Sequence, residues 1–186
     1  MADAKAGGGD GLRLFVAGEL PEAAKDALRL WQARVLEPRR DLRVNHELHL
    51  TLCFLGLTAP EAVPALVEAL SGIAWTACSA RVQGPLFLPQ RGPRRVIALA
   101  LEDPSGGLAR LRARVAAELA RTGSYELEER PWTPHVTVAR FRHHGQPFPL
   151  QNVNIMELRV VRMVLYSSLL KRAGAVHTPI AVFPAS

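Results

Sequence analysis

Two short segments of the chain carry the same alternation of histidine, apolar residue, threonine and apolar residue. The first is His49-Leu50-Thr51-Leu52 and the second is His135-Val136-Thr137-Val138. Side chains alternate between the two faces of a β-strand, so each segment, as a strand, places its histidine and threonine on one face. The two apolar residues then lie on the other face. One such strand is ordinary, but two copies in one chain indicate a shared site.

The side chains of these segments suit acid–base chemistry at phosphorus. An imidazole has an ordinary pKa of about 6.5, so at neutral pH one ring can be neutral while another is protonated. If His49 and His135 flank one phosphorus atom, one ring activates the incoming oxygen and the other protonates the leaving oxygen. The hydroxyls of Thr51 and Thr137 can donate to the non-bridging oxygens. We therefore expect cleavage of a phosphodiester with no metal and no cofactor.

Neighbouring residues raise other chemistries that the spacing does not favour. His46 and His49 are three positions apart, which in a strand directs them to opposite faces, and no carboxylate motif accompanies them as metal ligands. Cys53 shares the expected face of His49, but Ala139 takes the matching position in the second copy. We interpret Cys53 as a small space-filling residue in or beside the site. We interpret His177 as a turn residue, with a rim contact to RNA as the alternative.

The elements around the two motifs repeat in the same order. A buried strand precedes a helix that begins near a proline with acidic neighbours, at Pro21 and again at Pro104. A histidine strand follows each helix. This repetition predicts an α+β fold that is bilobal, with two pseudo-symmetric units (about residues 11–90 and 94–186). Each unit would have an antiparallel sheet and outer helices, and the active-site cleft would lie between the units.

Length and composition indicate one globular domain. The chain has 186 residues, of which 48% are hydrophobic and 22% are charged, as in ordinary soluble proteins. We expect residues 1–10 to be a disordered tail and residues 11–186 to be a single domain. No apolar run is long enough for a membrane span, and the N-terminus does not resemble a secretory signal. With two cysteines at unrelated spacing, we expect a reduced, monomeric, cytoplasmic protein.

Positive charge favours an anionic partner. The net charge is +6 and most of the basic residues are arginine, whose planar fork suits phosphate. Two groups of arginines could form a basic rim that steers RNA, or could equally be a solvated surface. These residues are Arg39, Arg40 and Arg43, and Arg91, Arg94 and Arg95.

The doubled motif, together with the residues around it, resembles the two-histidine (2H) phosphoesterase superfamily. Within that superfamily the chain looks like the LigT/ThpR-like RNA 2′,3′-cyclic phosphodiesterases, over essentially residues 12–183. The segments that carry the resemblance are Arg13-Leu14-Phe15-Val16-Ala17, residues 49–56, residues 133–140 and Leu165-Tyr166-Ser167-Ser168.

This resemblance implies a reaction and a set of roles. The implied reaction is hydrolysis of a 2′,3′-cyclic phosphate, at an RNA end or on a small cyclic nucleotide, to a 2′-phosphomonoester. Members of this branch also join RNA ends through a 2′,5′ linkage. The resemblance implies that His49 is the proton donor to the departing 3′ oxygen and that His135 is the proton acceptor that activates water. Thr51 and Thr137 carry over as phosphate contacts, and Arg140 as a phosphate or base contact.

Phe54 and Arg140 occupy matching places after the two motifs. Strict alternation puts both on the face opposite the histidines, so they reach the cleft only if each strand twists or bulges. Phe54 could stack on a base, although its place in the alternation favours a core aromatic. Arg140 favours a site contact, because an arginine at the end of an apolar strand needs an anion or solvent.

Two other functions stay open on the sequence. One is an enzyme of the same superfamily that acts on 2′,5′-oligoadenylate or another cyclic nucleotide. The other is a non-catalytic module that binds RNA or nucleotides. The symmetry of the two motifs does not by itself decide which histidine is the acid.

Overall fold

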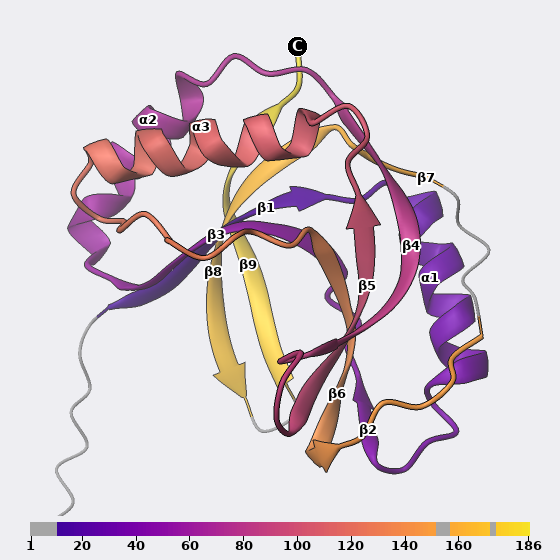
Figure 1. The fold of residues 1–186 in the computed structure, drawn as a ribbon. Coiled ribbons are helices and arrows are strands. Elements are labelled where there is room, and N and C mark those ends of the chain that lie inside the picture. Colours follow the sequence, from indigo (N-terminus) through magenta and orange to yellow (C-terminus); the bar gives the residue numbers. More distant parts are fainter. Residues whose placement is uncertain (1–10, 152–156, 172–173) are drawn as a thin grey trace, which may run out of the picture.

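The computed structural model describes residues 11–151, 157–171 and 174–186. These residues form a strongly curved antiparallel sheet with α-helices packed against its outer side (Figure 1). The strands are β1 (Leu12–Glu19), β2 (Leu42–Val44), β3 (His49–Thr58), β4 (Cys78–Leu88), β5 (Arg94–Glu102), β6 (His135–Gly145), β7 (Glu157–Val160), β8 (Arg162–Lys171) and β9 (Gly174–Pro184). The helices are α1 (Glu22–Val35), α2 (Val63–Ser71), which follows a 3-10 turn at Pro60–Ala62, and α3 (Gly107–Arg121).

The sheet consists of two halves that meet at the histidine strands. Its strand order is β7-β4-β5-β6-β3-β1-β8-β9, with β2 paired to the side of β6. β3 and β6 are joined at a single Cα pair, Leu50 with Val136, whereas their other neighbours pair along most of their lengths. The halves β9-β8-β1-β3 and β6-β5-β4-β7 therefore diverge from the point where the motifs cross. The expected α+β fold with two antiparallel units is confirmed.

The two halves do not coincide with the two repeats of the sequence. Strand β4, from the first repeat, pairs with β5, and β8, from the second repeat, pairs with β1. The expectation that residues 11–90 and 94–186 each build their own sheet is corrected here, because each half takes strands from both repeats. The physical reason is local: only residues 89–93 connect β4 to β5, so these two strands form a hairpin, and consecutive antiparallel strands pair readily.

The helices are exchanged between repeats in the same way. The apolar stripe of α3 is fully buried, as its spacing predicts, and α3 packs against β3 of the first repeat. On α1, the buried Gln32 donates from Nε2 to the carbonyl oxygen of Val138 in β6, at 2.8 Å. Each histidine strand is thus supported from behind by the helix of the other repeat. The residues of the α3 stripe are Leu108, Leu111, Val115 and Leu119.

Two local features shape the strands beside the motifs. Residues 42–44, in the stretch that follows α1, form β2 along the edge of β6. β3 continues past Gly56, which adopts a φ of +74° that glycine accommodates without a steric cost. None of the helices in the described residues has the length and apolar character needed to cross a membrane.

Candidate active site

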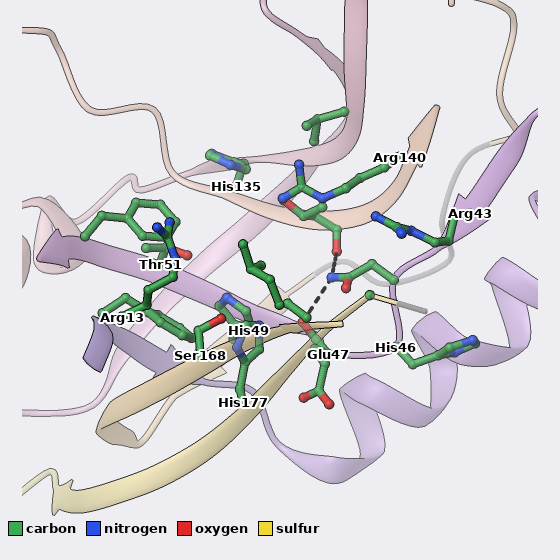
Figure 2. Close-up of a pocket in the computed structure, with 18 of the residues that line it drawn as sticks. Arg13, Arg43, His46, Glu47, His49, Thr51, His135, Arg140, Ser168 and His177 are labelled. Carbon is green, nitrogen blue, oxygen red and sulfur yellow. Dashed lines mark hydrogen bonds between the residues drawn. The ribbon is translucent and has the colours of Figure 1, made fainter. Parts of the chain in front are cut away.

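A cavity of about 550 Å³ opens where the two halves of the sheet meet, and both motifs face it (Figure 2). Residues of every strand except β7 line it, together with the loop between β2 and β3. All six residues that the sequence singles out as site candidates lie in its wall. They are His49, Thr51, Phe54, His135, Thr137 and Arg140.

The alternation within each motif sets which side chains face the cavity. Leu50 and Val136 are completely buried on the core side of the sheet. The histidine and threonine of each motif are partly exposed on the opposite side, toward the cavity. The apolar residues therefore anchor each strand to the core while the polar ones remain available to a ligand.

A β-bulge follows the threonine in both histidine strands. In β3 the partner of Val16 is Cys53 while the partner of Ala17 is Thr51, which leaves Leu52 as the extra residue. In β6 the same shift falls at Val138, between the partners of Ile97 and Ala98. A bulge places two successive side chains on the same side, so the alternation reverses beyond it.

The bulges explain where Phe54 and Arg140 lie. Both residues line the cavity, the outcome that the sequence made conditional on a bulge. The preference for Phe54 as a core aromatic is wrong, since 63% of its surface is exposed. The placement of Cys53 in or beside the site is also wrong, because its side chain turns into the core and is 2% exposed. Burial raises the pKa of the Cys53 thiol to about 11, so the thiol is unreactive.

A backbone carbonyl fixes the tautomer of His135. Its Nδ1 lies 2.8 Å from the carbonyl oxygen of Thr133. A carbonyl oxygen only accepts, so Nδ1 carries the hydrogen and Nε2 keeps its lone pair when the ring is neutral. The Nε2 atom of a neutral His135 is therefore free to accept a hydrogen bond or a proton.

The ring of His49 lies in a more enclosed, aromatic environment. It packs against Phe15, with the ring centroids 5.0 Å apart. Burial lowers the pKa of His49 to about 4, and the nearby rings of His177 and His135 add to the effect. Without a ligand, His49 is thus neutral at pH 7. An anion in the cavity would favour its protonated form.

His177 lies in the cavity wall, where the sequence placed it only as the alternative to a turn residue. Its interpretation as a turn residue is wrong, because it lies within β9 and lines the cavity. Its ring meets that of His49 edge-on, at 5.2 Å between centroids and 84° between planes. It also meets Phe15 at 4.8 Å. Only the pairing of β8 with β9, in which His177 lies opposite Ser168, brings it there, and no local pattern reveals that pairing.

Of the arginines that could form a basic rim, some lie at the cavity and others at the β4–β5 turn. Arg43 lies in the cavity wall and is the cross-strand partner of Arg140, while Arg13 reaches the same cavity from β1. Arg94 instead donates to the carbonyl oxygens of Pro89 and Gly92, where it holds the β4–β5 turn together. Neither Arg91 nor Arg95 is among the residues that line the cavity. Arg13 and Arg43 thus add positive charge to the site.

Comparisons with known proteins identify the family. The family model of the 2′-5′ RNA ligase superfamily matches residues 20–153, and the chain belongs to this superfamily. It is 30% identical over 175 residues to the RNA 2′,3′-cyclic phosphodiesterase of Escherichia coli (strain K12), covering 90% of this chain and 93% of that protein.

Two further relatives extend this similarity. The RNA 2′,3′-cyclic phosphodiesterase of Thermus thermophilus is 34% identical over 187 residues, covering 92% of this chain and 89% of that protein. The crystal structure of E. coli LigT complexed with 3′-AMP superposes with a TM-score of 0.78 at 26% identity. That superposition covers 95% of this chain and 99% of the other.

Proposed function

We propose that the protein hydrolyses a nucleoside 2′,3′-cyclic phosphate, at an RNA end or on a small nucleotide, to the 2′-phosphomonoester. The observation that carries this proposal is that β3 and β6 bring their two histidine–threonine pairs to one cavity. The names of the E. coli and T. thermophilus relatives support cleavage of a 2′,3′-cyclic phosphate, and the LigT structure with 3′-AMP supports a nucleotide as the ligand.

In the proposed reaction His135 is the base. A water molecule gives its proton to Nε2 of His135, the atom left as acceptor by the bond from Nδ1 to Thr133. The water oxygen attacks phosphorus, and the bond between phosphorus and the 3′ oxygen breaks. The phosphate then remains on the 2′ oxygen. Proton transfer of this kind contributes about 10²- to 10⁴-fold to a rate.

His49 is the acid that protonates the departing 3′ oxygen. It is neutral in the empty cavity, with a pKa of about 4. The negative charge of the bound diester raises the pKa of His49, so substrate binding itself favours protonation of the His49 ring. The buried aromatic surroundings that lower the pKa in the free enzyme also make the resulting imidazolium a strong proton donor. This couples the charged state of His49 to the presence of substrate.

The remaining site residues hold the substrate. Thr51 and Thr137 donate to the non-bridging oxygens from the two sides of the cavity. Phe54, exposed at one end, offers a ring on which a base can stack, a contact worth about 1–3 kcal/mol. Arg140 adds positive charge to the cavity beside the other motif. Attack by the 5′ hydroxyl of a second RNA in place of water, with the same leaving oxygen, would create a 2′,5′ linkage.

The test is turnover of adenosine 2′,3′-cyclic phosphate in excess EDTA, with the product isomer identified by phosphorus NMR. We expect complete conversion to the 2′-phosphate, because the 3′ oxygen is the leaving group and no metal takes part. Formation of the 3′-phosphate would reverse the proposed direction of cleavage. Absence of turnover with and without EDTA would exclude the proposed reaction and favour a binding module.

A further inference from the structure

The cavity face of β6 continues as a row of arginines beyond the second motif. Arg140 follows Thr137 across the bulge, and Arg142 lies two residues further on the same face of the strand. Arg43, on β2, is the direct cross-strand partner of Arg140. Like charges placed opposite each other on neighbouring strands repel, so this pair is unfavourable unless an anion lies between the two groups.

Acidic residues do not neutralise this row. Among the residues that the structure describes, no carboxylate forms an ion pair with Arg43, Arg140 or Arg142. Arg142 donates from Nε to the carbonyl oxygen of Arg40 at 3.1 Å, which holds its guanidinium in place with the terminal nitrogens free of that bond. The row therefore presents three guanidinium groups without a protein counter-charge.

The row leads from the catalytic cavity into a second one. This cavity, of about 330 Å³, shares Arg43, Val44 and His46 with the first, so the two lie side by side along β2. Arg142 and Arg39 line this second cavity and are not among the residues that line the first. Arg39 is paired with Asp41 and lies 3.7 Å over the ring of Phe148, so it is already compensated. The one carboxylate in the wall is Glu37.

We propose that Arg43, Arg140 and Arg142 form a phosphate track that binds the RNA backbone preceding the cyclic end. The proposal rests on the proposed function and names its substrate as an oligonucleotide rather than a free mononucleotide. The track begins beside the catalytic motif, where the first phosphate 5′ of the reacting nucleotide would lie. Arg142 is two strand residues, or about 6.7 Å, further from the site than Arg140.

An arginine row of this kind suits a nucleic-acid backbone. Each guanidinium presents a fork of donors that matches two phosphate oxygens. Contacts to phosphate fix the register of a strand without reading its bases, so the track would be indifferent to sequence. It would also make binding dependent on salt, since each neutralised phosphate releases counterions.

The experiment compares two substrates with the same reacting end. One is adenosine 2′,3′-cyclic phosphate and the other is a trinucleotide that ends in it. We expect wild-type kcat/KM to be higher for the trinucleotide. In Arg142→Gln the ratio of the two kcat/KM values should fall by about tenfold, the size of one charged hydrogen-bonded contact. The slope of log kcat/KM against log salt for the trinucleotide should become shallower by about 0.7.

Matched variants separate the track from a general charge effect. Arg114→Gln removes an exposed arginine from α3, away from both cavities, and should leave the ratio and the salt slope unchanged. Arg142→Lys keeps the charge and should keep the salt slope. Arg43→Gln should lower the same ratio of kcat/KM values, so the result does not depend on a single variant. Thermal denaturation checks that each variant is folded.

The outcomes distinguish this inference from the function on which it rests. If the mononucleotide is hydrolysed but the ratio and salt slope are the same in wild type, Arg43→Gln and Arg142→Gln, the track is overturned and the proposed function stands. If neither substrate is hydrolysed by the wild-type enzyme, the proposed function and the track are both overturned.

Discussion

At the scale of single residues, the site is two histidines made different by their surroundings. The motifs are nearly identical in sequence, yet Nδ1 of His135 is held by a carbonyl oxygen while the ring of His49 lies against Phe15 and His177. The first arrangement favours a proton acceptor. The second keeps the ring of His49 neutral at pH 7 in the empty cavity, where a bound anion would favour its protonated form. The asymmetry that sequence alone does not reveal therefore comes from neighbours outside the motifs.

The roles of the two histidines can be tested with a modified leaving group. In a cyclic phosphate with sulfur in place of the 3′ oxygen, the leaving thiolate needs no proton. We expect His49→Ala to recover most of the lost kcat on this substrate, because it lacks only the acid, whereas His135→Ala should recover little. Steady-state rates on the oxygen and sulfur substrates measure this. Recovery of kcat in His135→Ala alone would mean that His135 is the acid and His49 is the base.

The buried ring of His49 also predicts a pH dependence of stability. Its pKa is about 4 in the folded protein, against about 6.5 when unfolded. Below pH 6.5 the unfolded state therefore takes up a proton that the folded state does not, and stability falls as the pH drops from about 6.5 to 4. The full loss is about 3.5 kcal/mol at most, since one pKa unit corresponds to about 1.4 kcal/mol.

Urea unfolding at pH 7.5 and pH 5 measures this effect. The difference in unfolding free energy between the two pH values should be smaller in His49→Gln than in the wild type, because the variant lacks the titrating ring. Equal differences in both proteins would show that His49 keeps its ordinary pKa.

At the scale of elements, the bulges decide which side chains reach the cavity. Strict alternation located both motifs and correctly placed their histidines and threonines, because those residues precede the bulges. It misplaced Cys53 and Phe54 because a bulge depends on pairing with a neighbouring strand, which a single sequence does not contain. The preferred interpretation of His177 as a turn residue failed for the same reason, since β9 pairs with β8 far from either motif. Local periodicity thus predicts a face only up to the first irregularity.

The helix α1 holds the second bulge from behind through Gln32. This fully buried side chain donates from Nε2 to the carbonyl oxygens of Asn45, at 2.7 Å, and Val138, at 2.8 Å. Gln32→Leu leaves the carbonyl of Asn45 without this donor and should destabilise the fold by about 1–3 kcal/mol. Chemical denaturation measures the change. Gln83→Leu, at an exposed position of β4, is the matched control.

An unfolding free energy for Gln32→Leu equal to that of Gln83→Leu would contradict this role. A lower unfolding free energy in Gln32→Leu alone would support the role of Gln32. It would also connect the stability of β6 to the position of Thr137 and Arg140, which lie on either side of the bulge.

At the scale of the whole molecule, exchange of strands between repeats joins the two halves. The repeated order of elements predicted the number and kind of units, but not that β4 and β8 would each join the half built by the other repeat. The pairing of β4 and β8 depends on which sheet edge each strand meets, so local sequence patterns do not predict it. The helices α1 and α3 likewise contact the histidine strand of the other repeat. Neither repeat can therefore complete its sheet alone.

This exchange predicts a single cooperative unfolding transition, as expected if residues 11–186 form one domain. Trp31 reports on α1 and Trp132, which donates from Nε1 to the carbonyl oxygen of Thr51, reports on β3. Tryptophan fluorescence and far-ultraviolet circular dichroism should give the same urea midpoint. Two separated transitions would mean that the halves fold independently.

We propose that two histidines, one on each side of the cavity, carry the reaction. The most direct test is kcat/KM for adenosine 2′,3′-cyclic phosphate in His49→Ala and His135→Ala, with circular dichroism as a check on folding. We predict that each variant keeps its fold and loses about 10²-fold or more of its activity, the contribution of one general acid or base. A folded variant of either histidine with activity near that of the wild type would contradict the account.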